Sequence, residues 1–363
     1  MKGRSILEPD TEMYGKQPAM IDGGFNGMPY AQLGRSGLRV SKVGLGTWKI
    51  GFPETGDGSR IEQKTAFRIF DRAVELGVTF WDTANRYNGG SGNSERVIGR
   101  WFEENPDQRR NIVLATKVYE ASDGLTPNHC RLSRLNIKES FYTSLERLQL
   151  DKVDLLYFHA FDTLAPIDES LDAVADLISQ DLVRYLGVSN FRREHLLLYR
   201  ALEDQGYPRI IAVQNGFNIL QGPRPGEGEE GVLEYCAENG IGFIPYSPLA
   251  MGMLTERYLE PQKAGKGDRL VDEDRLAGVA TDANLLKLRE LHRLAGEWGY
   301  GMPELALAYS LSLPGLVSII PSASNPEQLE VNSRAGTIEL SVEQKTRLGE
   351  IFGFSSSESP RGH

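Results

Sequence analysis

The chain has 363 residues, of which 40% are hydrophobic and 25% are charged, a composition typical of ordinary globular proteins. Its formal net charge of -10 argues against nucleic acids and anionic membranes as partners, because both are negatively charged. No apolar run approaches the ~20 residues of a membrane-spanning helix, and the first ten residues lack the apolar core of a secretory signal. We therefore expect a cytoplasmic protein.

The cysteine and histidine content is low. Cys130 and Cys236 are too few for a disulfide framework, which fits a reducing compartment. His129 lies beside Cys130, but no second cluster of cysteine and histidine exists to complete a metal site. We therefore predict no metal.

The N-terminal residues 1–27 are rich in glycine and acidic residues, and we interpret them as an arm. Residues 30–33 and 38–41 are predicted to be two short strands around a turn that contains glycine. From residue 43 onward, short apolar runs alternate with segments of helical periodicity. The predicted strands are 43–46, 78–81, 112–116, 153–158, 183–188, 210–214, 242–246 and 317–321. The predicted helices are 61–76, 94–102, 134–148, 168–179, 192–203, 231–239, 284–295, 302–313, 326–332 and 340–352.

Eight strands that alternate with helices favour a single parallel (β/α)8 barrel over 28–353, followed by a tail at 354–363. An open doubly wound sheet is the structural alternative. Against it, no G-x-G-x-x-G motif opens the first helix, where such a sheet usually binds a dinucleotide. The stretch 251–283 is the longest without a predicted strand. Because it follows the seventh strand, we interpret it as a lid or cofactor strap over the active-site face.

Ionisable residues follow three consecutive strands at the point where each strand ends. Asp82, Lys117 and His159 hold these positions, and Tyr87 lies in the loop after Asp82. Because the carboxyl ends of parallel strands meet at one edge, we expect the four side chains to converge there. A buried aspartate needs a cation, and Lys117 can supply it.

This cluster is suited to carbonyl reduction. A phenol with a pKa near ~10 is a weak acid, and a nearby ammonium lowers that pKa. We therefore predict that Tyr87 gives a proton to a carbonyl oxygen, that Lys117 lowers its pKa and that Asp82 holds the ammonium. His159 would donate a hydrogen bond to the same oxygen.

Short motifs in the same order resemble the aldo-keto reductase family over roughly residues 29–335. They are Gly44-Leu45-Gly46-Thr47-Trp48, Asp82-Thr83-Ala84 followed by Tyr87, Asn93-Ser94-Glu95, Ala115-Thr116-Lys117, Val153-Asp154-Leu155-Leu156 with His159, Gly187-Val188-Ser189-Asn190-Phe191, Val213-Gln214-Asn215, Tyr246-Ser247-Pro248-Leu249 and Ile320-Pro321. The resemblance implies a barrel whose N-terminal hairpin plugs one end. Within this family, the sequence resembles the branch that includes the channel-associated β-subunits.

The cofactor implied by this resemblance is a nicotinamide nucleotide. Amide and hydroxyl groups of Ser189, Asn190 and Gln214 can bond a carboxamide, and Tyr246 can stack on the ring. By resemblance, Ser247, Pro248, Leu249 and Gly252 hold the pyrophosphate. Ser322, Ser324, Gln328 and Asn332 bind the adenosine end, where 324–328 read as a helix start. Thr47, Trp48 and Asp82 also match cofactor positions.

The chain departs from the family where many members carry a cation. Ser322 and Gln328 are neutral, which removes charge-assisted bonds to a 2'-phosphate. Val331 replaces an acidic residue that is common beside the adenine. We predict NADP(H) as the cofactor, with NAD(H) as a rival.

The predicted function is the NAD(P)H-dependent reduction of aldehydes or ketones to alcohols. Trp48, Tyr87 and His159 are the expected substrate contacts, with Trp81 or Phe161 as further lining. One alternative is the reverse reaction, an NAD(P)+-dependent sugar or alcohol dehydrogenase. A second is a low-turnover cofactor-binding subunit that senses redox state. A monomer and a homo-oligomer are both compatible with this sequence.

Overall fold

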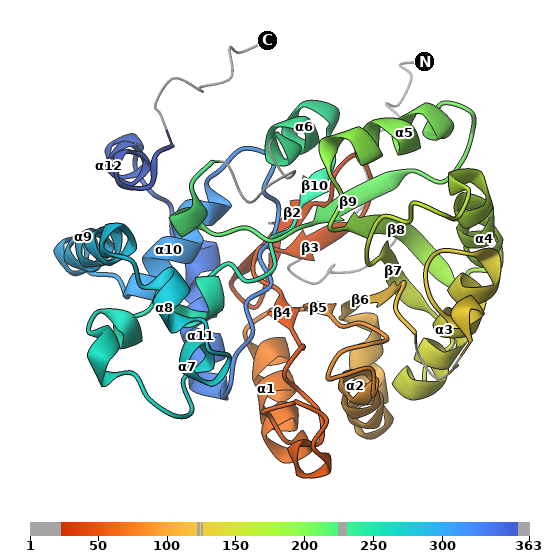
Figure 1. The fold of residues 1–363 in the computed structure, drawn as a ribbon, viewed down its shortest axis with the longest axis horizontal. Helices are drawn as coiled ribbons and strands as arrows, with labels where there is room; N and C mark the ends of the chain where they lie inside the picture. Colours follow the sequence, from red (N-terminus) through yellow and green to blue (C-terminus); the bar gives the residue numbers. More distant parts are fainter. Residues whose placement is uncertain (1–22, 122–123, 125, 224–230, 355–363) are drawn as a thin grey trace, which may run out of the picture.

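The computed structural model describes residues 23–121, 124, 126–223 and 231–354, so most of the predicted arm and tail lie outside it. Seven parallel strands form one sheet in the order β10-β9-β8-β7-β6-β5-β4. Strand order follows chain order without a reversal, as in a (β/α)8 barrel, and the sheet curls around a central axis (Figure 1). The strands are β4 (Leu45–Gly46), β5 (Phe80–Asp82), β6 (Val113–Val118), β7 (Val153–Phe158), β8 (Val183–Ser189), β9 (Ile210–Gln214) and β10 (Gly242–Phe243).

The barrel is closed by the predicted eighth strand, which forms isolated bridges instead of a continuous ladder. Val43 pairs with Ile319, and Phe243 pairs with Leu316, both in parallel. The amide of Gly44 donates to the Ile319 carbonyl at 2.7 Å. Pairing is short here because β4 and β10 are two residues long and Pro321 has no amide to donate. The predicted (β/α)8 architecture is confirmed.

A separate antiparallel sheet covers one end of the barrel. It contains β1 (Gly24–Phe25), β2 (Met28–Gln32) and β3 (Arg39–Ser41) in that order. The hairpin of β2 and β3 was predicted, whereas β1 lies in the segment predicted as an arm and pairs with β2. Leu33 and Val40 are buried in the same cluster as the inward-facing strand residues Phe80 and Tyr157. The hairpin therefore plugs the barrel.

Helices surround the barrel (Figure 1). Helix α1 buries Ala66, Ile69, Phe70 and Ala73, which recur at helical spacing. The helices are α1 (Gln63–Glu75), α2 (Asn93–Glu104), α3 (Arg134–Leu148), α4 (Ile167–Ser179), α5 (Arg193–Glu203), α6 (Val232–Asn239), α7 (Arg269–Asp272), α8 (Leu276–Val279), α9 (Asp282–Trp298), α10 (Met302–Leu311), α11 (Pro326–Arg334) and α12 (Val342–Phe352).

The segment 251–283 contains no strand, as predicted, but it does contain the short helices α7 and α8. It leaves the barrel through a backbone with three left-handed residues that are not glycine: Ser247, Ala250 and Met251. Such residues cost free energy and concentrate at functional sites. At the other end of the chain, Phe354 packs its ring against Phe217 and Tyr309. The packed part of the chain therefore extends to Phe354.

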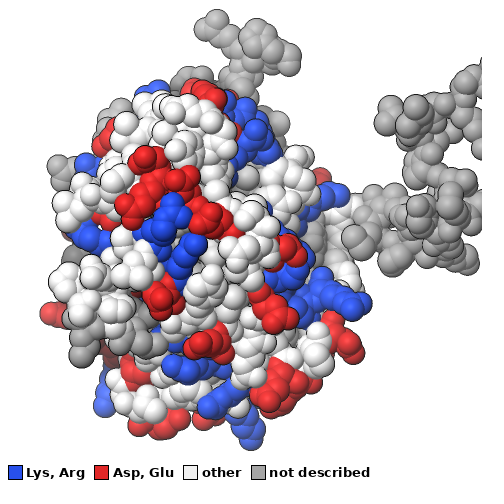
Figure 2. All heavy atoms as spheres, turned by 90° about the vertical axis from the view of Figure 1, so that its right-hand side faces the viewer, with Lys and Arg blue, Asp and Glu red and all other residues white. Residues whose placement is uncertain are grey.

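The surface carries interspersed charges of both signs. On the face in Figure 2, lysine and arginine alternate with aspartate and glutamate without forming a basic patch. Arg134 and Lys138 of α3, for example, both pair with Asp176 of α4, at 2.8 and 2.9 Å. In the described ranges, no helix combines the length and apolar character required to cross a bilayer.

Candidate active site

Lys117 joins the ionisable residues at the carboxyl edge of the barrel. Its Nζ donates to Asp82 Oδ1 at 2.5 Å, to the Thr83 carbonyl at 2.8 Å and to Tyr87 Oη at 2.6 Å. Tyr87 Oη in turn donates to Asp82 Oδ1 at 3.1 Å. Strands β5 and β6 are paired, which brings Asp82 and Lys117 to one edge from positions 35 residues apart. The predicted convergence of these three side chains is therefore present.

The Asp82–Lys117 pair is almost completely removed from water, with side chains 1% and 0% exposed. A buried pair is tolerated only when its remaining lone pairs and protons are also bonded. Here the second carboxylate oxygen of Asp82 accepts a hydrogen bond from Gln214 Nε2 at 2.7 Å. Asp82 thus has a cation, a phenol and an amide as partners, and its position is fixed.

The pKa of Tyr87 is raised well above its usual value, first by burial and then by the negative charge of Asp82. We predicted that Lys117 would lower this pKa, and the net direction is the opposite. Lys117 is itself buried, which lowers the pKa of its ammonium, although Asp82 opposes that shift. The phenol therefore holds its proton at neutral pH.

His159 lies beside the phenol, with its ring edge-on to the Tyr87 ring and the two centroids 6.2 Å apart. Burial lowers the pKa of His159 to about 3, and the positive charges of Lys117 and Arg86 act in the same direction. The imidazole is therefore neutral at physiological pH. Its Nδ1 is buried and has no hydrogen-bond partner among the described residues, and His159 is not among the residues that line the cavity described next.

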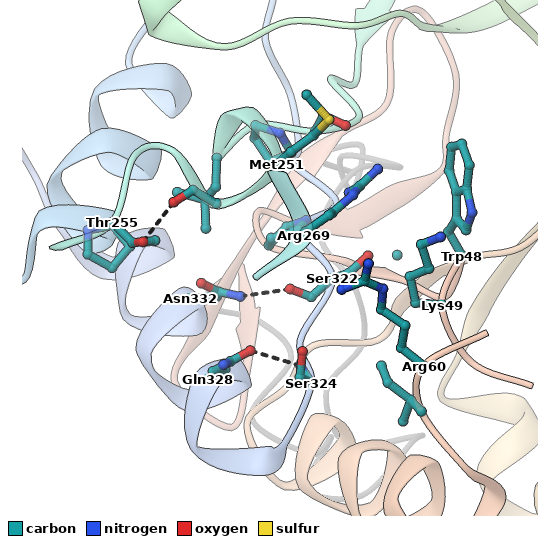
Figure 3. A pocket seen from close by; sticks show the side chains of 18 of the residues that line it. Trp48, Lys49, Arg60, Met251, Thr255, Arg269, Ser322, Ser324, Gln328 and Asn332 are labelled. Carbon is teal, nitrogen blue, oxygen red and sulfur yellow. Dashed lines mark hydrogen bonds between the residues drawn. The ribbon is translucent and has the colours of Figure 1, made fainter. Parts of the chain in front are cut away.

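A cavity of about 600 Å³ opens beside these residues, a volume within the usual range of ligand sites. Its lining includes Tyr87 and residues at the start of α11, and Figure 3 shows Trp48 on one side of the cavity and Gln328 on another. The predicted site residues that line it are Trp48, Asp82, Tyr87, Tyr246, Ser247, Pro248, Leu249, Gly252, Ser322, Ser324, Gln328 and Asn332.

The other predicted cofactor residues lie behind the wall of the cavity. Thr47 is buried, and its hydroxyl donates to the Asp82 carbonyl at 2.9 Å. Gln214 is also buried and bonds Asp82. Ser189 is buried at the end of β8, where its hydroxyl accepts from Asn190 Nδ2 at 3.2 Å. These residues support the wall in the structure.

Asn190 connects two of the candidate site residues. Its Nδ2 donates to the His159 carbonyl at 2.8 Å, and its Oδ1 accepts from Tyr246 Oη at 2.9 Å. Asparagine suits this position because its backbone is left-handed, with φ of 58°. Gly216 packs against the Tyr246 ring, where an added Cβ would lie 3.1 Å from two ring carbons and from the hydroxyl oxygen. The ring of Tyr246 is therefore held in one orientation.

The far end of the cavity is formed by the N-terminus of α11. Asn325 Oδ1 accepts from the Gln328 amide at 2.8 Å, which caps the helix as predicted. Gln328 Oε1 accepts from the Ser324 amide at 2.9 Å (Figure 3). Asn332 Nδ2 reaches the Ser322 carbonyl at 3.5 Å. The residues that were matched to the adenosine end thus lie together.

Two of the expected pocket aromatics lie elsewhere. Trp81 is fully buried and packs against Phe70 and Trp101, with centroids 4.7 and 4.9 Å away. Because side chains alternate along a strand, Trp81 points toward the helices. Phe161 stacks on His195 with centroids 3.7 Å apart. Neither residue lines the cavity, so this part of the prediction was wrong.

Sequence reasoning missed four cations that line the cavity: Lys49, Arg60, Arg257 and Arg269. They come from the loop after β4 and from the segment after β10, whose paths have no periodic pattern. The position of Lys49, directly after Trp48, was the one available signal. No cluster of three or more potential metal ligands was found within the described residues.

A parallel barrel with a buried lysine–aspartate pair and a tyrosine at its carboxyl edge defines an enzyme-like site. The chain belongs to the aldo/keto reductase family, whose model matches residues 42–352, and it is an oxidoreductase of that family. It is 35% identical to an uncharacterized oxidoreductase, YrpG, of Bacillus subtilis, over 93% of this chain and 99% of the relative.

Other relatives cover a similar share of the chain. Aldo-keto reductase AMT2 of Alternaria alternata is 30% identical over 92% of this chain and 93% of its own length. L-glyceraldehyde 3-phosphate reductase of Escherichia coli K12 is 31% identical, over 85% of this chain and 87% of that enzyme. The similarity therefore extends over nearly the whole barrel in each case.

Proposed function

We propose that this protein reduces aldehydes or ketones to alcohols with NAD(P)H, and that Tyr87 donates the proton. The observation that carries the proposal is the ammonium of Lys117, which donates hydrogen bonds to Tyr87 at 2.6 Å and to Asp82 at 2.5 Å, at the carboxyl edge of the barrel. Burial and the charge of Asp82 keep the phenol protonated before reaction, and the ammonium places a cation beside the phenolate that is formed. Both properties are required of a proton donor.

The substrate oxygen gains negative charge as the carbonyl is reduced. Tyr87 transfers its proton to this oxygen, and the Lys117 ammonium stabilises the phenolate left behind. Neutral His159 offers a ring nitrogen for a hydrogen bond to the same oxygen. Because the Lys117 and Asp82 side chains are buried, their electrostatic interactions are stronger than they would be in solution.

The bound nicotinamide would supply the hydride, and the cavity residues suit such a group. Tyr246 presents a fixed ring at the end nearest Tyr87. Ser247, Leu249 and Gly252 line the middle of the cavity, and Ser324 and Gln328 line its far end. The left-handed backbone at Ser247 and Gly252 turns the chain along the wall of the cavity. An elongated molecule with two phosphates would contact all three regions.

We propose NADP(H) rather than NAD(H) as the cofactor. Helix N-termini attract phosphate, and the start of α11 faces the cavity with Ser324 and Asn325 in its lining. Gln328 bonds the Ser324 amide, so this side chain must move to expose that donor to a 2'-phosphate. The neutral Ser322 and Gln328 predict a modest preference between the two nucleotides.

A fluorescence titration with NADPH and NADH, followed by turnover of 4-nitrobenzaldehyde, tests the proposal. We expect binding of NADPH and measurable reduction by the wild-type protein. The variant Tyr87→Phe, which lacks only the phenolic hydroxyl, should retain cofactor binding and lose at least about 100-fold in kcat. Near-normal turnover by this variant would exclude Tyr87 as the donor.

The same assay separates the alternatives. Nucleotide binding with turnover of alcohols in the presence of NADP+, and none of carbonyls in the presence of NADPH, would assign the dehydrogenase direction. Binding without turnover in either direction would favour a redox-sensing subunit. Absence of nucleotide binding would refute all three functions.

A further inference from the structure

A second buried ion pair lies close to the reactive edge of the barrel and has no role in the proposed reaction. Glu95 of α2 and Arg147 of α3 have side chains that are 0% and 2% exposed, and Arg147 Nη1 lies 3.4 Å from Glu95 Oε2. Burying two charges costs free energy that their mutual attraction does not reliably recover. The pair is therefore a poor source of stability by itself, and the groups that its two members hold become the relevant question.

Arg147 contacts both ends of the loop that carries Tyr87. At the start of the loop, its Nη1 donates to the Asn85 carbonyl at 2.8 Å, two residues before Tyr87. At the end of the loop, the guanidinium packs against Gly92, where an added Cβ would lie 2.2 Å from Nη1. Gly92 is the N-cap of α2 and has a left-handed backbone, with φ of 66°. The loop 83–92 therefore closes on one buried guanidinium.

Glu95 connects this guanidinium to the strand that carries Lys117. Its Oε1 accepts a hydrogen bond from the Thr116 hydroxyl at 2.6 Å, and Thr116 directly precedes Lys117 on β6. Because side chains alternate along a strand, Thr116 faces the helices while Lys117 faces the interior of the barrel. The Asn85 amide also donates to the Lys117 carbonyl at 3.2 Å, which joins the loop to the same strand. Glu95 thus lies behind both the loop of the proton donor and the strand of its cationic partner.

The charge of Glu95 also acts on Lys117. Burial lowers the pKa of the Lys117 ammonium, and the negative charges of Asp82 and Glu95 oppose that shift. Burial raises the pKa of Glu95 itself, whereas the hydrogen bond from Thr116 and the charge of Arg147 favour its ionised form. Two buried cations, one from α3 and one from β6, therefore share the field of this one carboxylate.

We propose that Glu95 and Arg147 are positioning residues that hold Tyr87 at hydrogen-bond distance from Lys117, an inference that rests on the proposed reductase function. The phenolic oxygen lies 2.6 Å from the ammonium, although Tyr87 belongs to a loop. Loop residues hold such a distance only when neighbouring elements fix them in place. The pair fixes the loop through Arg147 and the strand through the bond between Glu95 and Thr116. A misplacement of about 1 Å at a reacting group can cost about 100-fold in rate.

The kinetic test uses the double variant Glu95→Gln/Arg147→Met, which removes both charges so that neither is left stranded in the interior. Glutamine retains an oxygen for the Thr116 hydroxyl, whereas the Asn85 carbonyl loses the Arg147 donor. With NADPH and 4-nitrobenzaldehyde, kcat should fall about 10- to 100-fold, because the phenol is no longer held at its bonding distance. The Kd for NADPH should change far less than kcat, since neither Glu95 nor Arg147 lines the cavity.

Two matched controls separate positioning from a general loss of stability. Arg109→Met breaks a mostly buried pair with Asp154, at 2.9 Å, near the start of β7 and so at the opposite end of the barrel. It should lower the midpoint of thermal unfolding and leave kcat unchanged. Glu103→Gln removes an exposed carboxylate from α2 and should change neither quantity. If the double variant does not fold, Arg147→Lys replaces it, with a smaller fall in kcat expected, because lysine keeps the cation but lacks the guanidinium fork.

Hydrogen exchange of the loop 83–92 tests the anchoring without any turnover. In the double variant, backbone amides of this loop should exchange about 10-fold faster than in the wild-type protein, whereas those of β9 should keep their protection. In Arg109→Met, exchange of the loop should stay unchanged. Faster exchange of the loop in the double variant, together with a wild-type protein that reduces no carbonyl, would refute the reductase function and still support the anchoring. With an active wild-type protein, unchanged kcat or unchanged loop exchange in the double variant overturns the proposal, as does an equal fall of kcat in Arg109→Met.

Discussion

Lys117 offers the sharpest test of how the site is held together. Its ammonium has three acceptors and is completely buried, while Asp82 beside it is 1% exposed. The variant Lys117→Met keeps most of the length of the side chain and removes its charge. It leaves the Asp82 carboxylate in the barrel with only neutral donors, namely Gln214 and Tyr87. Stranding one partner of a buried pair costs about 3–5 kcal/mol, and we expect this loss in the free energy of unfolding.

The measurement is urea unfolding monitored by circular dichroism at pH 7. The double variant Asp82→Asn/Lys117→Met removes the stranded charge and keeps an oxygen for Gln214. It should therefore be more stable than Lys117→Met by about 1–3 kcal/mol, the scale of coupling between contacting residues. The control Lys263→Met breaks an exposed pair and should cost about 0–1 kcal/mol. A loss below about 1 kcal/mol in Lys117→Met, or additive losses in the double variant, would refute this account.

Other predictions concern pH and packing. The pKa of His159 is about 3 in the folded protein, against an ordinary value of 6.5. Between these two pH values, the unfolded chain binds a proton at this residue that the folded chain does not. His159 therefore lowers the free energy of unfolding as the pH falls from 6.5 toward 3. Between pH 4 and 8, the free energy of unfolding of the wild-type protein should change by up to about 1.4 kcal/mol per pH unit, and the variant His159→Asn should lack this contribution. Equal slopes in the wild-type protein and the variant would contradict the burial of His159. Gly187→Ala places a Cβ 2.4 Å from the buried Tyr157 ring and should cost about 1–3 kcal/mol in thermal or urea unfolding. Gly296 lies on α9 with open space around it, so Gly296→Ala should instead raise the free energy of unfolding by about 0.5–1 kcal/mol. A change of the same sign in both glycine variants would be inconsistent with this packing.

Local sequence patterns predict much of the fold. Helix α3 has the predicted limits, 134–148, because Ser133 caps its start and the apolar spacing is regular. Strands β6 and β7 are mostly apolar and are buried along nearly their whole length, as expected for strands covered on both faces. The eighth strand shows the limit of such patterns. Its apolar run predicts a strand, but the pairing length depends on two short neighbours.

The ionisable residues of the site were predictable for the same reason. Asp82, Lys117 and His159 each end an apolar run, and the rule that parallel strands share a carboxyl edge brings them together. The direction of the Tyr87 pKa was not predictable. It depends on whether burial and Asp82 outweigh Lys117, and burial is a property of the packed chain.

The sequence by itself determined the barrel, the order of its strands and the residues at its reactive edge, because periodicity and strand ends are local properties. Only the tertiary structure decided which side chains reach the cavity. Thr47 and Gln214 turned inward to Asp82, and Trp81 turned toward the helices. Lys49 and Arg269, which are far apart in sequence, share the carboxylate of Glu273. Loops carry no periodic signal, so contacts between them follow from the path of the folded chain.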